Sequence, residues 1–62
     1  MDRYFVTHCS VNGKAYRFGA IAADPVEAER KAAQAAYNYY NIQLAGVPVY
    51  TEEITEKEYN EL

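Results

Sequence analysis

The sequence predicts an α+β fold in which an N-terminal β-hairpin is followed by one long α-helix and a third antiparallel strand, the order ββαβ. Two observations carry this prediction. An Asn-Gly step separates two runs of aromatic and β-branched residues, and an alanine-rich run begins with Asp-Pro. With 62 residues and 50% hydrophobic content, we expect one folded domain over residues 1–62, near the lower limit for folding alone.

Residues 3–11 and 14–22 are the expected hairpin strands, joined by Asn12-Gly13 in a type I′ turn. A two-residue turn fixes the register and divides the side chains between two faces. The expected core face holds Phe5, Cys9, Val11, Phe18 and Ala20. The other face is too apolar for a purely solvated surface, and it holds Tyr4, Val6, His8, Ser10, Arg17, Gly19 and Ile21.

The helix is expected to start after Asp24, which can cap a free backbone N–H, with Pro25 at the first helical position. Glu27 stands at the reciprocal capping-box position, and the helix runs to about Asn41. One stripe of small residues and a tyrosine should lie close on the sheet: Ala28, Ala32, Ala35, Ala36 and Tyr39.

A third strand is expected over residues 47–51, after a linker at 42–46. Pro48 cannot donate to a ladder, so it favours an edge position or a strand start. Thr55 and Glu58 match a capping box, which predicts a short C-terminal helix over residues 56–62.

Small domains usually need an additional source of stability. Cys9 is the only cysteine and His8 the only histidine, which leaves no disulfide and too few ligands for zinc. We expect no metal or cofactor. The remaining sources of stability are self-association and unusually good packing, and we favour a homodimer. The unpaired cysteine, the lack of a signal-peptide pattern and the lack of a long apolar run indicate a cytoplasmic protein without a membrane segment.

Catalysis is not expected. His8 and Cys9 are adjacent, so in a strand they point to opposite faces and cannot form a nucleophile–base pair. Cys9 is interpreted as a small core hydrophobe. No second base or oxyanion donor is identifiable, so the chain is expected to bind rather than to catalyse.

The seven tyrosines are many for this length. We interpret Tyr16 and Tyr39 as the rim of the core. Tyrosine is enriched in interface hot spots, and the candidates for partner binding are Tyr4, Tyr37, Tyr40 and Tyr50. His8 lies across the hairpin from Arg17, and the pair is either ordinary surface or part of a binding face.

The negative charge is concentrated near the C-terminus. Residues 51–62 hold five glutamates and one lysine, whereas residues 1–50 hold five basic and four acidic side chains. A nucleic-acid binder would show a basic face, so direct DNA binding is not expected. The acidic end is either a solvated surface or a surface that docks on a basic groove, with Glu52, Glu53 and Glu56 in the places of phosphates.

The stretch from Val11-Asn12-Gly13-Lys14 through the Asp24-Pro25 helix start to Ala32 resembles small phage-encoded anti-CRISPR proteins in pattern and size. That resemblance implies a non-catalytic inhibitor that binds a host nucleoprotein, such as a CRISPR effector, in the host cytoplasm. The same order of elements is similar to the arm-binding domain of phage integrases, which implies a DNA-binding accessory module. A small dimeric structural or interaction protein is the third interpretation.

Overall fold

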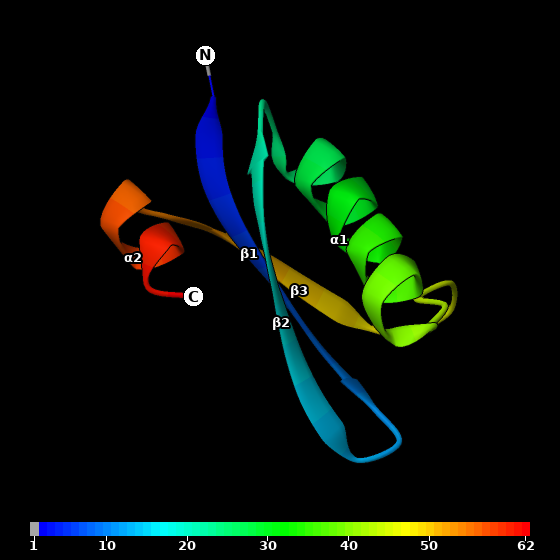
Figure 1. Ribbon diagram of the computed structural model, residues 1–62. Coiled ribbons are helices and arrows are strands. Elements are labelled where there is room, and N and C mark those ends of the chain that lie inside the picture. The colour runs from blue at the N-terminus through cyan, green and yellow to red at the C-terminus, as the bar shows by residue number, and fades with distance from the viewer. Residues whose placement is uncertain (1) are drawn as a thin grey trace.

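The computed structural model describes residues 2–62, which form a three-stranded antiparallel sheet with one helix on each face (Figure 1). The sheet has the order β2-β1-β3, so β1 is the central strand, and the expected ββαβ order with a short C-terminal helix is confirmed. The elements are β1 (Arg3–Val11), β2 (Lys14–Ala22), α1 (Pro25–Tyr40), β3 (Val49–Ile54) and α2 (Glu56–Asn60).

The hairpin turn has the backbone conformation that its two residues predict. Asn12 has a φ of 53° and Gly13 a φ of 78°, which only a short polar residue and glycine adopt readily. The strands pair with Val11 opposite Lys14 and Cys9 opposite Tyr16, so the expected register is confirmed. The far end of the hairpin extends past α1 (Figure 1).

Local hydrogen bonds define both ends of α1. The Asp24 carboxylate accepts from the Glu27 backbone N–H at 2.8 Å, and the Glu27 carboxylate accepts from the Ala23 N–H at 2.9 Å. The helix ends where Asn41 enters the left-handed region with a φ of 56°. The predicted start is confirmed, and the end lies within one residue of the expected one.

Small residues bring α1 close to the sheet. Ala28, Ala32 and Ala36 are at most 1% exposed and lie over the side of the sheet that carries Phe5 and Phe18. We call this side the α1 face. Phe5 and Thr7 are the largest fully buried side chains, and the Thr7 hydroxyl lies 2.8 Å from that of Thr51. Of the expected core residues, Val11 alone is only half-buried.

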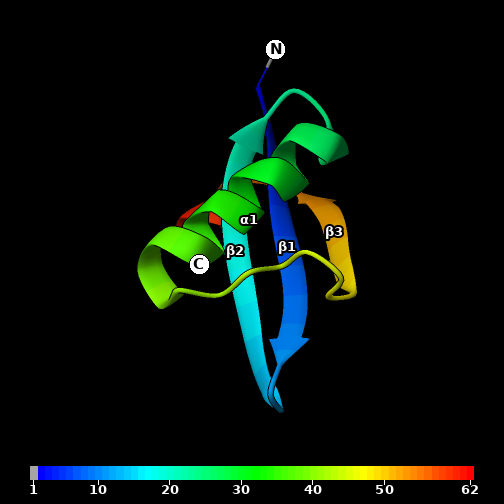
Figure 2. The same ribbon diagram turned by 90° about the vertical axis from the view of Figure 1, so that its right-hand side faces the viewer.

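The placement of Tyr39 at the core rim is wrong, because this side chain is 80% exposed. The last turn of α1 lies at the outer side of β2 (Figure 2), and the residue that faces the sheet there is Tyr40, four residues after buried Ala36, rather than Tyr39. Tyr40 packs on the sheet instead, with its ring 5.2 Å from Tyr16 and 5.9 Å from Phe18 between centroids.

The third strand is shifted toward the C-terminus from the expected range of residues 47–51. Pro48 precedes the strand, which then continues through Glu52 and Glu53 to Ile54. Glutamates are poor strand formers, but on this edge strand Glu53 meets Arg3, so tertiary contacts decide the strand end. The Thr55–Glu58 capping box is confirmed, and α2 stops at Asn60 rather than at residue 62.

Replacing Ala32 by leucine should destabilise the fold by about 1–3 kcal/mol, because the added atoms enter a closed helix–sheet contact. Urea unfolding followed by circular dichroism measures the change. Gln34→Leu, at an exposed position of the same helix, is the matched control and should leave the midpoint nearly unchanged. Equal midpoints for the two variants would contradict close packing at Ala32.

Candidate functional site

The sheet face opposite α1, which we call the α2 face, is only partly covered. Helix α2 lies against β1 there, and its Tyr59 and the following Leu62 approach Gly19 of β2. A Cβ at residue 19 would lie 2.7 Å from Leu62 Cδ1 and 3.0 Å from Tyr59 Cε1, so the missing side chain lets the C-terminal segment pack closely. Burial of Val6, which is 4% exposed, explains part of the apolar character that the sequence shows on this face.

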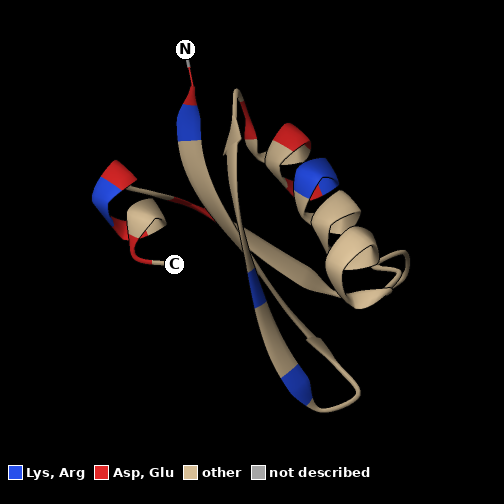
Figure 3. Cartoon of the chain, viewed as in Figure 1, with Lys and Arg blue, Asp and Glu red and all other residues tan. Residues whose placement is uncertain are grey.

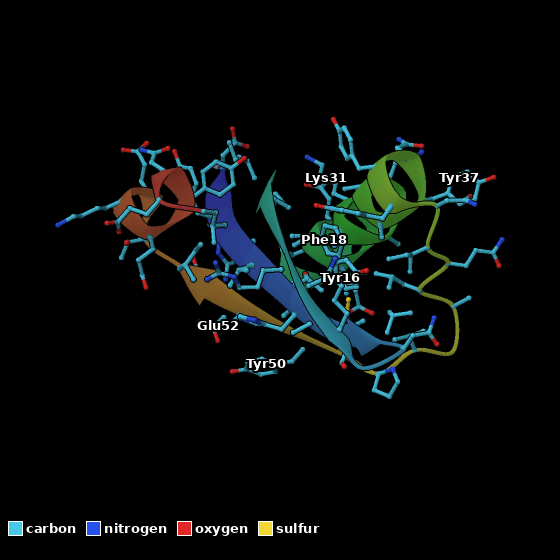
Figure 4. All side chains as sticks on the ribbon, turned by 60° about the horizontal axis from the view of Figure 1, so that its bottom comes forward. Tyr16, Phe18, Lys31, Tyr37, Tyr50 and Glu52 are labelled. Carbon is cyan, nitrogen blue, oxygen red and sulfur yellow. The ribbon has the colours of Figure 1, made fainter. Side chains whose placement is uncertain are left out.

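The uncovered part of the α2 face centres on His8 of β1. Its ring stacks on that of Tyr50 at 6.0 Å between centroids, and its Nε2 lies 3.7 Å from a Glu52 carboxylate oxygen. Arg17 lies opposite His8 in the register of the hairpin. Tyr50 is 63% exposed, and Tyr50 and Glu52 lie on the side of the sheet away from α1 (Figure 4). The structure therefore brings together four of the nine residues that the sequence proposes for partner binding.

A hollow of about 250 Å³ separates this cluster from the C-terminal segment. Val6, Ile54 and Leu62 supply apolar lining, whereas His8 and Arg17 supply basic groups. Three carboxylates also line it: Glu52, Glu58 and Glu61. This combination suits a long cationic side chain, whose stem needs apolar contact and whose head needs carboxylates.

Glu58 and Glu61 are site residues that the sequence reasoning missed. Glu58 had a structural explanation as the capping-box residue, and its carboxylate does accept from the Thr55 N–H at 3.0 Å. These bonds with the Thr55 backbone and hydroxyl hold the pKa of Glu58 below its usual value. Glu58 and Glu61 lie near His8 because α2 folds back on the sheet, and no local sequence pattern indicates this packing.

Glu53 and Glu56 do not line the hollow, because each has a partner elsewhere. Arg3 donates to both Glu53 carboxylate oxygens, at 2.9 and 2.8 Å, and holds the pKa of Glu53 below its usual value. Glu56 accepts from the Tyr4 hydroxyl at 2.5 Å, and the Tyr4 ring packs on Tyr59 at 5.3 Å between centroids. Acidic residues nevertheless gather at the α2 end of the molecule (Figure 3).

Tyr37 and Tyr40 are remote from this cluster. Both lie in the last turn of α1 and are 54% and 55% exposed. Tyr37 lies far from Tyr50 (Figure 4), and Tyr40 packs on Tyr16 and Phe18 on the α1 face. The nine proposed residues thus form three groups: the His8 cluster with Arg17, Tyr50 and Glu52, the internally paired Tyr4, Glu53 and Glu56, and the α1 tyrosines.

Cys9 is a buried free thiol in β1. Burial raises the pKa of the Cys9 thiol, which keeps it protonated and unreactive. Within residues 2–62, no group of three or more His, Cys, Asp or Glu side chains is placed to hold a metal ion. Neither helix of this described range has the length and apolar character needed to cross a membrane.

Comparison with known proteins found no matching family model, no matching curated protein and no matching solved structure.

Acid should destabilise the protein partly through Glu53. Its folded-state pKa lies below the usual 4.5, so the stabilisation is present above that value and is lost as the pH falls through the lower folded-state pKa. Urea midpoints measured from neutral to acidic pH should therefore fall less steeply for Glu53→Gln than for the unchanged protein. Glu61→Gln, at an exposed carboxylate that follows α2, should keep the original slope. Parallel curves for the unchanged protein and Glu53→Gln would contradict the ion pair.

Tyr4 should ionise at a higher pH than an ordinary tyrosine. The Glu56 carboxylate accepts a hydrogen bond from the Tyr4 hydroxyl, which raises the pKa of Tyr4 above 10.0. This contact stabilises the fold below that pH and is lost as the pH rises through the raised pKa. NMR titration of ring-labelled tyrosine should show a lower pKa for Tyr4 in Glu56→Gln but not in the control Glu61→Gln. The same Tyr4 titration in all three proteins would show that the hydrogen bond does not form in solution.

Proposed function

We propose that this chain is a small non-catalytic binding protein that inhibits a host defence nucleoprotein by occluding a basic surface that handles nucleic acid. This is the mode of action implied by its resemblance to phage-encoded anti-CRISPR proteins. The observation that carries the proposal is the hollow on the α2 face, which is lined by Glu52, Glu58 and Glu61 and by His8, whose ring stacks on exposed Tyr50.

The carboxylates of this hollow are held on folded elements rather than on a loose tail. Glu52 lies in β3, which pairs with the central strand. Glu58 is held by the capping box, in which Thr55 and Glu58 each hydrogen-bond to the other's backbone N–H. Groups that are already ordered lose less conformational entropy when a partner binds. Preorganised carboxylates can therefore take the positions of phosphates on a basic surface.

Charge and aromatic contact would have separate roles in this complex. The net charge of −3 favours approach to a basic partner and raises the association rate. Tyr50 offers a broad exposed ring, stacked on His8 at the edge of the hollow, and supplies contact area at low entropy cost. Arg17, on the opposite wall of the hollow, gives the site a positive side, so a partner with mixed charge would bind in one orientation.

The DNA-binding alternative draws less support from the structure. Arg3 is one of three basic residues in the hairpin, and its guanidinium binds Glu53 and the Ala23 carbonyl. Lys14 lies 5.4 Å above the Tyr16 ring centre, near the tip of the hairpin. Because phosphate contacts supply most of the affinity for duplex DNA, a hairpin with so few free basic groups is a poor DNA-binding surface.

Affinity capture from host lysate tests the proposal when the elution is done with a nucleic-acid competitor. The immobilised protein should retain a nucleic-acid-binding protein that excess duplex DNA or RNA releases, as mass spectrometry would show. The variant Glu52→Gln/Glu61→Gln should lose most of this capture, because both carboxylates line the hollow. The control Asp2→Asn/Glu53→Gln makes the same change in net charge and should retain it, because Asp2 does not line the hollow and the charge of Glu53 is already balanced by Arg3.

Two results would contradict the proposal. One is capture that neither nucleic acid nor the Glu52→Gln/Glu61→Gln variant disturbs. The other is direct binding of duplex DNA by the purified protein with a steep dependence on salt concentration, which would indicate phosphate contacts made by the chain itself.

A further inference from the structure

Strand β3 leaves one of its backbone edges open. It pairs with β1 on one side, and in the described sheet it has no strand on the other. In a two-residue hairpin, the pair that flanks the turn exchanges both backbone hydrogen bonds, and every second pair does the same. Following this alternation from Val11 and Lys14 across β1, the residues of β3 whose N–H and C=O groups point outward are Val49, Thr51 and Glu53.

The two edges of the sheet differ in how they are protected. On the β2 edge, the Lys31 ammonium donates to the Ile21 carbonyl at 2.6 Å, and the charged Arg17 also lies on this strand. Lysine on an edge is a common protection against pairing with another strand. On the β3 edge, the charge of Glu53 is balanced by Arg3, and Pro48 lies outside the strand.

An apolar groove lies on the α1 face between α1 and residues 44–49, and it reaches the open edge at Val49, the first residue of β3. Its volume is about 500 Å³, and Glu29 and Arg30 of α1 also line it. Helix α1 lies mainly over β2 and β1, which leaves the outer side of β3 less covered (Figure 2). Val26 is 68% exposed beside the groove. The aliphatic residues of the lining are Val26, Ala33, Leu44, Ala45, Val47 and Val49.

We propose that a second copy of this chain occupies this edge, with the two β3 strands antiparallel about a two-fold axis at Thr51. An open backbone edge is complementary to another extended strand. In this register, each Thr51 lies opposite its own copy, and each Tyr50 lies opposite Glu52 of the second copy. No like charges stand directly opposite, whereas an axis at Glu52 would place two carboxylates together.

The groove favours a second copy over an unrelated strand. An axis at Thr51 brings the two grooves to one seam, so the exposed Val26 of each copy can be covered by apolar side chains of the other. Glu29 and Arg30 are adjacent on the rim of each groove, so Glu29 of one copy can pair with Arg30 of the other across the axis. The added burial is also what a 62-residue domain with few large core side chains lacks.

The resulting sheet would have six strands, in the order β2-β1-β3 followed by the same three strands reversed. Because the paired strands run in opposite directions, the two α2 helices would lie toward opposite ends of the assembly. The two hollows would lie on the same face of this sheet, and Glu52 of each would stand next to Tyr50 of the other copy. This dimer does not depend on the proposed inhibitory function, and either can fail without the other.

Light scattering coupled to size exclusion tests the dimer over a concentration series. The expected mass is twice the 7.1 kDa of one chain. Val26→Asp should weaken the association by about tenfold or more, since it places a charge in the seam. Tyr39→Asp adds the same charge to an exposed position elsewhere on α1 and should leave the association unchanged. Urea unfolding of both variants separates loss of association from loss of fold.

A backbone variant makes the test specific for β3. Chemical synthesis can place an N-methyl group on the Thr51 amide, which points outward, and the control carries it on Arg17, whose amide points outward from β2. Only the Thr51 form should become monomeric, and in the unmodified dimer the Thr51 and Glu53 amides should be protected from hydrogen exchange.

Two outcomes would overturn the proposal. One is a monomeric protein at every concentration, which would leave the edge to a strand of a different protein. The other is a dimer that survives both Val26→Asp and N-methylation of Thr51, which would place the interface elsewhere.

Discussion

The turn at Asn12 and Gly13 sets the register of the hairpin, and the contacts on both sheet faces depend on it. With the register fixed, Phe5 and Phe18 point toward α1, whereas Val6 and Gly19 point toward α2. A shift by one residue would exchange the faces. The phenylalanine side chains would then point toward α2, and Leu62 could no longer pack against Gly19.

The parts of the fold that the sequence predicts are those governed by local interactions. The positive φ at Gly13 and the caps at Asp24 and Thr55 involve residues no more than a few positions apart. The end of β3 and the exposure of Tyr39 were not predictable in this way. The end of β3 depends on Arg3, which is fifty residues away from Glu53 in the sequence. The exposure of Tyr39 depends on which side of α1 faces the sheet at the outer side of β2.

In the candidate site, too, local contacts were predictable from the sequence and long-range contacts were not. Strand register alone places His8 beside Arg17, and this was available from the sequence. The sequence also shows that Tyr50 and Glu52 are two residues apart, but not that they lie next to His8. Residue type cannot distinguish a free carboxylate from a paired one. The sequence therefore grouped Glu52 with Glu53 and Glu56, although in the structure Glu53 pairs with Arg3, Glu56 accepts from Tyr4, and Glu52 alone of the three lines the hollow.

The alanine stripe of α1 limits how this sequence can vary over evolutionary time. Ala28, Ala32 and Ala36 are spaced four residues apart and lie almost in contact with the strands, so only glycine or serine could replace them at modest cost. The outward side of the helix has no such restriction. As related sequences diverge, most residues of the helix could therefore be replaced, while small residues at these three positions would be retained. That pattern, with the Asn-Gly turn, is the signature by which a distant relative with this architecture could be identified.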